Sequence, residues 1–349
     1  MVVLIVSVAG VVAPSLLSAQ TVIITDTTLT ADNVGGITIG AHGIVLDCNG
    51  HRISGAATGI TLNGKTSVTV RNCVVTNNGN GIVVSSSSGN TFEANTVEGN
   101  AGGIQLTAAG GNMLRRNTVR RNSQFGVRID TFSNGNNLRE NTISNNARGL
   151  DVLSSVGNTV VNNNFFDNQV QAAVVGTTWF SLALPTGGNY WTDFDTPAEG
   201  CSDQDGDGFC DAPRVVVSPW GQDNLPWTRP FGEATVVSID IKPASLNPGA
   251  QGTIPVAIYS TSSFDVSSVD LSTVKLAGMS VALLGNGSPQ ASLVDLNGDG
   301  LLDLLVHIST EALDVAARST NQTGTLTLEG RTLNGGAIRG TDSVKIVGD

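Results

Sequence analysis

Hydrophobic and polar positions follow a repeating pattern between residues 59 and 170. Each unit opens with a glycine and continues with the period-2 apolar pattern typical of a β-strand. The opening glycines are Gly59, Gly81, Gly103, Gly126 and Gly149, spaced 22 or 23 residues apart. A short unit at a nearly fixed period indicates a solenoid in which each unit forms one coil. We therefore predict stacked strands and not amphipathic helices.

Apolar residues stand three positions before and two positions after a marker residue in each unit. Because side chains alternate between the two faces of a strand, these positions are expected to point inward and build one core. The first column is Val70, Phe92, Leu114, Leu138 and Val160, and the second is Val75, Val97, Val119, Ile143 and Phe165.

The marker residues form a column of their own, which is Cys48, Cys73, Asn95, Asn117, Asn141 and Asn163. Stacked strands lie about 4.8 Å apart, so successive asparagine amides can hydrogen-bond as a ladder. A second column at the next corner is Asn78, Asn100, Asn122, Asn146 and Asn168. We expect these asparagines to adopt the left-handed conformation of a tight turn. The pattern predicts a right-handed parallel β-helix.

Composition and the first residues narrow the class of protein. Of 349 residues, 42 are glycine, 13% are charged, and the net charge is −11, which indicates an acidic, turn-rich β protein and argues against nucleic acid as a partner. Residues 1–19 form an apolar run that predicts a signal peptide, with a retained membrane anchor as the alternative. We expect an extracytoplasmic protein, in the periplasm or at the cell surface, without integral membrane contact after cleavage.

Several segments carry a family resemblance. They are Val-Leu-Asp-Cys-Asn-Gly-His at 45–51, Val-Thr-Val-Arg-Asn-Cys at 68–73, the Gly-Asn-x5-Thr-Val/Ile units, and the closing runs at 188–193, 203–211 and 223–226. In order and spacing they resemble NosD-like β-helix repeat proteins over most of residues 40–230. The resemblance implies a pectate-lyase-like solenoid but no particular activity.

The NosD family takes its name from a periplasmic accessory protein linked to copper-site maturation. Soft copper sites use methionine, cysteine and histidine side chains. The chain has three methionines, and its histidines are His42, His51 and His307, which are not clustered. A copper role is therefore the less favoured implication of the resemblance.

Residues 201–211, Cys-Ser-Asp-Gln-Asp-Gly-Asp-Gly-Phe-Cys-Asp, have the ligand spacing of a calcium loop. The expected ligands are Asp203, Asp205, Asp207, the carbonyl of Phe209, and Asp211. Gly208 supplies the sharp turn, but Arg214 stands where an EF-hand has its bidentate glutamate. We predict calcium of modest affinity, and a turn that hydrogen-bonds to itself is the alternative.

A second loop between two apolar runs repeats this spacing. Its expected ligands are Asp295, Asn297, Asp299, the carbonyl of Leu301, and Asp303. Val306 stands at position 12, so this loop also lacks the terminal glutamate. We interpret both loops as structural calcium sites that stabilise the folded chain by mass action.

The four cysteines fall into two pairs. Cys201 and Cys210 bracket the first calcium loop, and we predict a disulfide there, as expected of an exported protein. Cys48 and Cys73 are neighbours in the marker column, within the Cα range of a disulfide. Two buried thiols would pack equally well at that place, so both states remain open.

The four tryptophans all lie in one stretch, and they are Trp179, Trp191, Trp220 and Trp227. Aromatic rings can stack on sugars, but the open end of a solenoid also needs a cover. We interpret residues 171–232 as a cap and linker.

The pattern changes after residue 232 to short β-runs separated by turn residues, which predicts a β-sandwich. Ile-Asp-Ile-Lys-Pro at 239–243, Ile-Pro-Val-Ala-Ile at 254–258 and Gly-Thr-Asp-Ser-Val at 340–344 resemble an accessory domain of secreted bacterial proteins. The predicted chain is thus all-β, with a signal peptide at 1–19, a β-helix at 20–170, a cap and linker at 171–232 and a sandwich at 233–349.

One group of outward positions has side chains suited to ligand binding, and it comprises Gln105, Arg128, Asp130 and Asp151. Polysaccharide lyases and hydrolases of this architecture use acids, and in lyases a base, on an exposed sheet face, which makes Arg128, Asp130 and Asp151 catalytic candidates. An ordinary surface ion pair is the alternative. We expect Arg128→Ala to leave the fold intact, because outward residues contribute little to the core.

Four arginines share one coil, and they are Arg115, Arg116, Arg120 and Arg121. They could attract an acidic glycan. Their columns, however, place Glu93 and Glu98 on the preceding coil and Glu140 on the following one. We therefore predict cross-strand ion pairs.

The motifs of known β-helix enzymes do not occur in the chain. It lacks the Asp-Asp pair and Gly-His-Gly of pectin hydrolases and the Asp-Pro-His of alginate-modifying enzymes. We predict a non-catalytic polysaccharide-binding, surface-binding or scaffolding protein of the cell envelope, stabilised by calcium. A polysaccharide lyase or glycoside hydrolase and a NosD-like copper-site accessory protein are the alternatives.

Overall fold

The computed structural model describes residues 3–4, 20–184, 186–217, 221–243, 245–246, 252–261, 264–310 and 322–346. The chain divides into two compact units, the first holding residues 1–202 and 210–231 and the second residues 203–209 and 232–349. Apart from β1 (Val3–Leu4), the expected signal peptide lies outside the described residues, and so does Trp220. No helix in the described ranges is long and apolar enough to cross a membrane.

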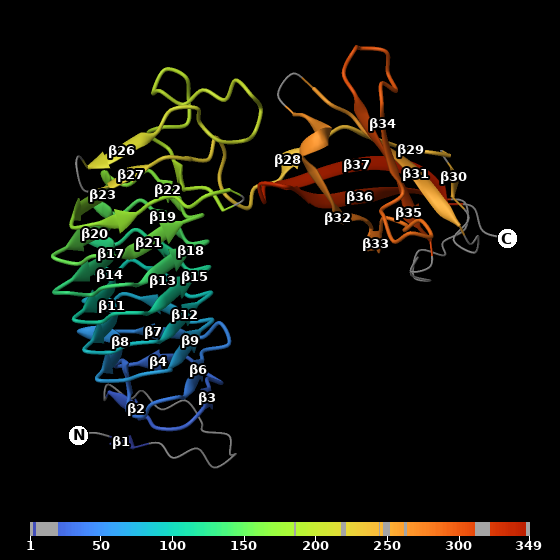
Figure 1. Cartoon of the computed structure of the whole chain (residues 1–349). Coiled ribbons are helices and arrows are strands. Elements are labelled where there is room, and N and C mark those ends of the chain that lie inside the picture. Colours follow the sequence, from blue (N-terminus) through green and yellow to red (C-terminus); the bar gives the residue numbers. More distant parts are fainter. Residues whose placement is uncertain are drawn as a thin grey trace. The chain divides into compact units, whose positions relative to one another are not determined.

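The first unit is a parallel β-solenoid whose coils contribute strands to three sheets (Figure 1). The first sheet contains β1, β2 (Thr21–Ile23), β5 (Ile37–Ile39), β8 (Thr58–Asn63), β11 (Asn80–Ser85), β14 (Gly102–Thr107), β17 (Phe125–Asp130), β20 (Arg148–Leu153) and β23 (Val170–Val175). The second contains β4 (Asn33–Val34), β7 (Arg52–Ser54), β10 (Val74–Thr76), β13 (Thr96–Glu98), β16 (Thr118–Arg120), β19 (Thr142–Ser144), β22 (Asn164–Phe166) and β25 (Tyr190–Trp191). The third contains β3 (Thr27–Thr28), β6 (Val45–Asp47), β9 (Thr69–Arg71), β12 (Thr91–Glu93), β15 (Met113–Arg115), β18 (Asn137–Arg139), β21 (Asn158–Val161) and β24 (Thr178–Trp179).

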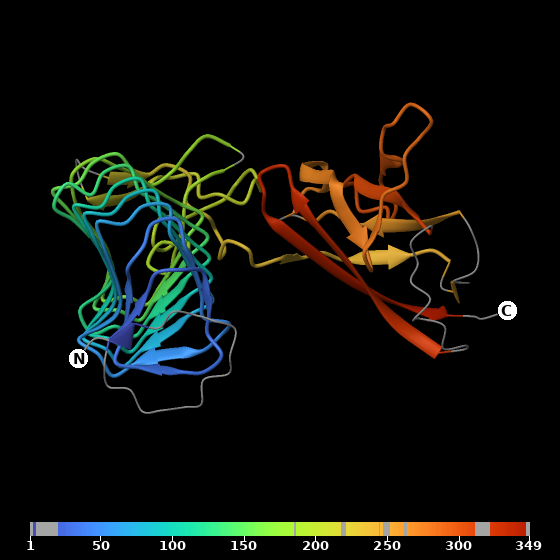
Figure 2. The same cartoon turned by 90° about the horizontal axis from the view of Figure 1, so that it is seen from below.

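The coils wind around a common interior (Figure 2), which the two predicted apolar columns fill together with inward residues of the first sheet such as Ile82 and Leu106. Every member of both columns, from Val70 to Val160 and from Val75 to Phe165, is at most 1% exposed. The inward orientation predicted from the spacing is therefore confirmed.

The glycine that opens each coil is required by the neighbouring coil. A Cβ atom on Gly103 would lie 2.1 Å from the carbonyl oxygen of Gly126 and 2.9 Å from a methyl of Val119. The first of these contacts is with backbone, so a side-chain rotation cannot relieve it. This close approach explains why glycine recurs at each unit start.

Both predicted asparagine columns form hydrogen-bonded ladders. The Nδ2 of Asn95 donates to Oδ1 of Asn117, Asn117 to Asn141, and Asn141 to Asn163, at 2.8–3.0 Å. Each acceptor oxygen also takes the backbone N–H of the preceding asparagine. The second column bonds in the same way and ends at Gln171, whose Oε1 accepts from Asn168 at 2.8 Å.

The prediction that the asparagines of the second column are left-handed was wrong by one residue. Positive φ angles occur just before each ladder asparagine, at Asn77, Gly99, Arg121, Asn145 and Asp167. The chain turns at these residues, which leaves the ladder asparagine free to aim its amide inward and its backbone N–H at the next coil.

Cys48 and Cys73 continue the first ladder as a disulfide, with Sγ atoms 2.05 Å and Cα atoms 4.7 Å apart. The backbone N–H of Cys73 donates to Oδ1 of Asn95. At the other end the stack extends farther than residue 170, since β23, β24 and β25 pair with the preceding coil. The antiparallel hairpin of β26 (Arg214–Val217) and β27 (Gly221–Asp223) follows.

The second unit consists of two sheets and one short 3₁₀ helix, η1 (Val266–Ser268), in the part of the chain described. One sheet contains β28 (Thr235–Val236), β37 (Ala337–Ile346), β36 (Gln322–Thr332), β32 (Val269–Leu276), β33 (Met279–Ser280) and β30 (Ser245–Leu246). The other contains β29 (Ile239–Ile241), β31 (Thr253–Ile258), β35 (Asp303–Ser309) and β34 (Ala291–Val294). Val274 and Leu328 of the first sheet share a core with Val256 and Val306 of the second, as in a β-sandwich.

Candidate functional site

Strand register assembles the predicted polar group on the first sheet. Pairing of β14, β17 and β20 places Gln105 opposite Arg128 and Arg128 opposite Asp151. Asp130 follows Arg128 by two residues on β17 and therefore shares its face. Register also aligns a polar column along this sheet, which is Asn63, Ser85, Thr107 and Asp130. We call this column, together with Gln105 and Arg128, the polar strip.

Asp151 lies on the outward face of β20, but two arginines bury it completely, so its carboxylate is not exposed to a ligand as we expected. Its Oδ2 accepts from Nε and Nη2 of Arg128 at 3.0 and 2.8 Å, and its Oδ1 accepts from Arg148 at 3.2 Å. The Arg128 guanidinium also lies 4.2 Å from the centre of the Phe125 ring. Removing Arg128 would leave this buried carboxylate with Arg148 as its remaining cation, and a buried charge that loses a partner destabilises the fold. Arg128→Ala is thus not the fold-neutral variant that we expected.

Gln105 and Asp130 form the other contact of this face. Gln105 Nε2 donates to Asp130 Oδ2 at 3.1 Å and to Thr107 Oγ1 at 3.3 Å. Asp130 Oδ1 is enclosed and has no hydrogen-bond partner within the described residues. The fold thus holds one carboxylate oxygen through Gln105 and leaves the enclosed one without a donor.

Three of the four arginines that share one coil are paired with glutamates of adjacent coils, as predicted. Arg115 pairs with Glu93 at 2.8 Å and Arg120 with Glu98 at 2.7 Å. Arg116 pairs with Glu140 at 2.7 Å and approaches Glu93 at 3.6 Å. Arg121 is exposed and has no carboxylate within 4.0 Å among the described residues, so the pairing predicted for this coil holds for three of its four arginines.

The first Asp-rich loop gathers three carboxylates. Oxygen atoms of Asp203, Asp205 and Asp207 all lie within 4.8 Å of one another. The Asp203 carboxylate accepts backbone N–H bonds from Gly206, Asp207 and Gly208 at 2.8–3.1 Å. Burial raises the pKa of Asp203, and the charges of Asp207 and Asp205 raise it further, against the N–H bonds that lower it. Gathering these acids is costly without a cation.

The second loop has the same backbone. Asp295 accepts from Gly298 at 2.7 Å and from Gly300 at 3.0 Å, as Asp203 does from Gly206 and Gly208. In both loops the glycines at positions 4 and 6 have positive φ. Asp303, predicted as a ligand, is fully buried and accepts the N–H groups of Ser260 at 3.0 Å and Leu296 at 2.9 Å. Asp303 thus connects this loop, through Leu296, with the segment that directly follows β31.

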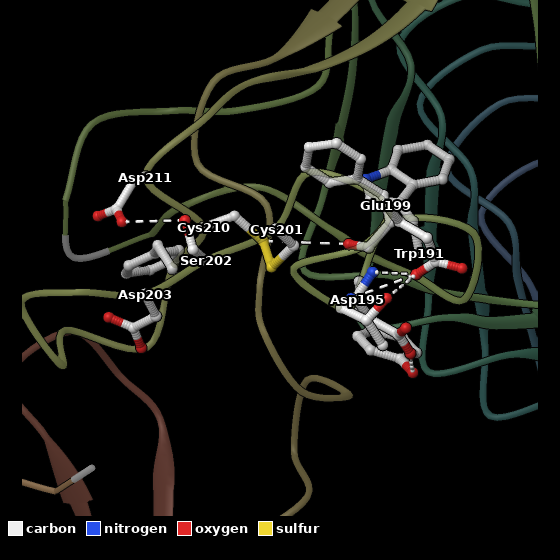
Figure 3. The surroundings of a disulfide bond; sticks show 12 residues. Trp191, Asp195, Glu199, Cys201, Ser202, Asp203, Cys210 and Asp211 are labelled. Atoms are coloured by element: carbon white, nitrogen blue, oxygen red, sulfur yellow. Dashed lines mark hydrogen bonds between the residues drawn. A yellow bond between two sulfur atoms is a disulfide. The ribbon is translucent and has the colours of Figure 1, made fainter. Parts of the chain in front are cut away.

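A disulfide closes the base of the first loop (Figure 3), with Sγ atoms of Cys201 and Cys210 1.99 Å apart. Beside it, Ser202 Oγ donates to Asp211 Oδ2 at 3.4 Å. Arg214 occupies position 12, where an EF-hand has a calcium-binding glutamate. Its guanidinium instead forms a two-pronged ion pair with Asp193.

Buried aromatic residues close the end of the stack. The Trp191 ring lies parallel to the Phe165 ring, with centres 4.3 Å apart. The Arg214 guanidinium lies 4.2 Å from the centre of the Trp191 ring. Trp227 is buried and donates its Nε1–H to Asn162 Oδ1 at 3.1 Å. These contacts support the cap interpretation, whereas Trp179 is 56% exposed.

Asp223, which the sequence analysis did not single out, ends the first ladder. Asn163 donates to Asn189 Oδ1 at 3.0 Å, and the backbone N–H of Asn189 donates to Asp223 Oδ2 at 2.8 Å. Trp191 Nε1 donates to the same oxygen at 2.9 Å. Burial raises the pKa of Asp223 to about 6, although these hydrogen bonds lower it. A Cβ on Gly188 would lie 1.8 Å from Asp223 Oδ1, so only glycine fits there.

In the part of the chain that the structure describes, histidine and cysteine side chains do not form a group of metal ligands. All four cysteines are in disulfides. His42 bonds to Thr66 and His51 lies 3.4 Å from Asp32, while His307 belongs to the second unit. The described residues therefore do not fit a copper site, and we derive no chemistry through that metal.

The fold is that of a parallel β-helix repeat protein with a further pair of sheets after the β-helix. Residues 10–196 match the family model described as periplasmic copper-binding protein (NosD), and the chain belongs to that family. None of the curated proteins compared with the chain matches it. A similar solved structure is the enzymatically active domain of tailspike protein 2 of bacteriophage CBA120, at 12% identity and a TM-score of 0.33. That match covers 98% of this chain and 60% of the tailspike chain.

Proposed function

We propose that the chain is an extracytoplasmic saccharide-binding protein whose binding surface is the polar strip. The observation that carries this proposal is the register of Asn63, Ser85, Thr107 and Asp130 over four successive coils. Hydroxyl, amide and carboxylate groups at intervals of about 4.8 Å suit an extended chain of sugar hydroxyls. Membership of a periplasmic family and two disulfides support a location outside the cytoplasm.

Binding fits this face better than cleavage does. Glycoside hydrolysis ordinarily uses two carboxyl groups that both reach the substrate. Asp151 is fully buried, so Asp130 is the remaining acid of the predicted group. A lyase base at Arg128 would first have to leave its two hydrogen bonds to Asp151.

Gln105→Ala is expected to abolish or strongly weaken saccharide binding, because it removes the amide that orients Asp130. The control is Gln124→Ala, since Gln124 is exposed, precedes β17 and is not a member of the polar strip. A glycan array would first identify a ligand, and calorimetric titration would then compare both variants with the wild type. Equal affinity in all three proteins, or product release from the wild type, would contradict the proposal.

We further propose that both Asp-rich loops bind calcium as a structural ion. The support is their shared backbone, in which the position-1 carboxylate accepts N–H groups from positions 4 and 6. In the first loop this geometry also leaves three acids within 4.8 Å. Carboxylate and carbonyl oxygens are the ligands calcium prefers.

Excess EDTA is expected to lower the melting temperature, since calcium at 100 times its Kd would stabilise by about 2.7 kcal/mol per site. Asp207→Ala should remove the effect of the first loop and Asp299→Ala that of the second. Glu233→Ala, which removes an exposed acid elsewhere, serves as the control. Calorimetry that shows no shift with EDTA in the wild type would eliminate both calcium sites.

A further inference from the structure

The second unit contains a cavity of about 560 Å³ on one face of its larger sheet. The side chains and backbone that line it belong to β32, β36, β37 and the segment before β28. Its polar lining residues are Thr273, Lys275, Glu329, Arg331 and Arg339. Three of these are cations and one is an acid, in a chain whose net charge is −11.

Strand register builds this lining. Lys275 stands opposite Glu329, and Glu329 stands opposite Arg339. Their neighbours Val274, Leu328 and Ile338 are buried in the sandwich core, so the charged side chains project from the opposite face. Lys275 and Arg339 are two strand spacings apart, roughly 10 Å, with Glu329 between them.

The cations of this cavity lack carboxylate partners such as those that six of the solenoid arginines have. No carboxylate oxygen of the described residues lies within 4.0 Å of the charged nitrogens of Lys275, Arg331 or Arg339. One N–H of Arg331 donates to the carbonyl of Gly335 at 2.9 Å, which orients its guanidinium. In the first unit, by contrast, Arg115 and Arg128 each pair with an acid at 2.8 Å.

We propose that this cavity, which we call the cationic cavity, binds an acidic saccharide independently of the polar strip. Guanidinium and ammonium groups bind carboxylate or sulfate oxygens through charge-assisted hydrogen bonds. Glu329 would repel a single compact anion placed between the cations, but it can accept hydrogen bonds from sugar hydroxyls. The lining therefore favours a ligand whose acidic groups are separated by hydroxyl-bearing rings.

Titration calorimetry of the full chain with oligogalacturonate tests the proposal. The double variant Lys275→Gln with Arg339→Gln is expected to raise Kd at least tenfold, a loss of about 1.4 kcal/mol. Lys345→Gln is the matched control. Lys345 is exposed on the same strand as Arg339, and this substitution removes one positive charge outside the cavity. Unchanged melting temperatures would verify that the variants fold. If the double variant does not fold, the single variant Arg339→Gln takes its place in the titration.

Two further probes separate the ligand classes. The neutral methyl ester of the same oligosaccharide should bind at least tenfold more weakly than the acid, and inorganic sulfate should also bind more weakly. Equal binding of the ester would overturn the role of the charges, and equal binding of sulfate would reduce the cavity to a simple anion site. An equal effect of Lys345→Gln would show attraction by net charge alone. Gln105→Ala should leave this affinity unchanged, which distinguishes failure here from failure of the polar strip.

Discussion

Asn117→Ala is expected to lower the free energy of unfolding of the first unit by about 3 kcal/mol or more. Asn117 Nδ2 donates to the carbonyl of Phe92 and to Asn141 Oδ1, both at 2.9 Å. Its Oδ1 accepts from the backbone and the side chain of Asn95, both at 3.0 Å. Each buried polar group left unpaired costs about 1–3 kcal/mol, and alanine leaves several.

The matched control is Asn137→Ala, one coil away on the outward face of β18. Asn137 is half-buried, and its side chain accepts one long hydrogen bond, from Arg139 at 3.3 Å. Its loss should change stability by no more than about 0.5 kcal/mol. Denaturant unfolding of both variants provides the comparison, and similar losses would mean that the ladder adds nothing beyond an ordinary surface amide.

The coil architecture could be predicted because equivalent positions of neighbouring coils contact one another, and these contacts restrict which residue types can stand there. Gly103 must be glycine because the carbonyl of Gly126 lies against it, and Asn117 must be asparagine because its neighbours are amides. Each constraint recurs once per coil, so it appears in the sequence as a period.

A third asparagine ladder escaped prediction, and it consists of Asn90, Asn112, Asn136 and Asn158. Each of these asparagines follows a glycine with positive φ, beginning with Gly89. A Gly-Asn pair is also an ordinary turn signal, so local composition does not distinguish a solvated turn from a buried ladder. The recurrence of the pair at the coil period was the available signal.

The candidate site was harder to predict than the fold, because strand alternation assigns a face but not what covers it. Asp151 has outward parity on β20, yet Arg128 and Arg148 enclose it. Arg148 begins the same strand, where the sequence gives no sign that its side chain folds back. Asp223 acts on Asn189 from a hairpin 34 residues later, and no period connects the two.

Between about pH 4 and pH 6, the first unit is expected to lose stability as the pH rises, and Asp223 is the cause. The unfolded carboxyl ionises near pH 3.9, whereas burial raises the pKa of Asp223 in the folded chain to about 6. The folded state therefore holds this proton over a range in which the unfolded state has released it. The stabilisation is complete below about pH 4 and is lost as the pH passes about 6, by up to about 3 kcal/mol.

The cation that stacks on the Trp191 ring does not offset the effect. Arg214 stacks over Trp191, the indole that donates to Asp223, but its charge is balanced by Asp193 at 2.7 Å. Asp223→Asn removes the titration while keeping an oxygen acceptor for Asn189. Unfolding free energies measured in EDTA at several pH values should therefore diverge between wild type and variant across this window. Curves that stay parallel from about pH 4 to pH 7 would show that Asp223 is ionised throughout, and that its N–H bonds outweigh its burial.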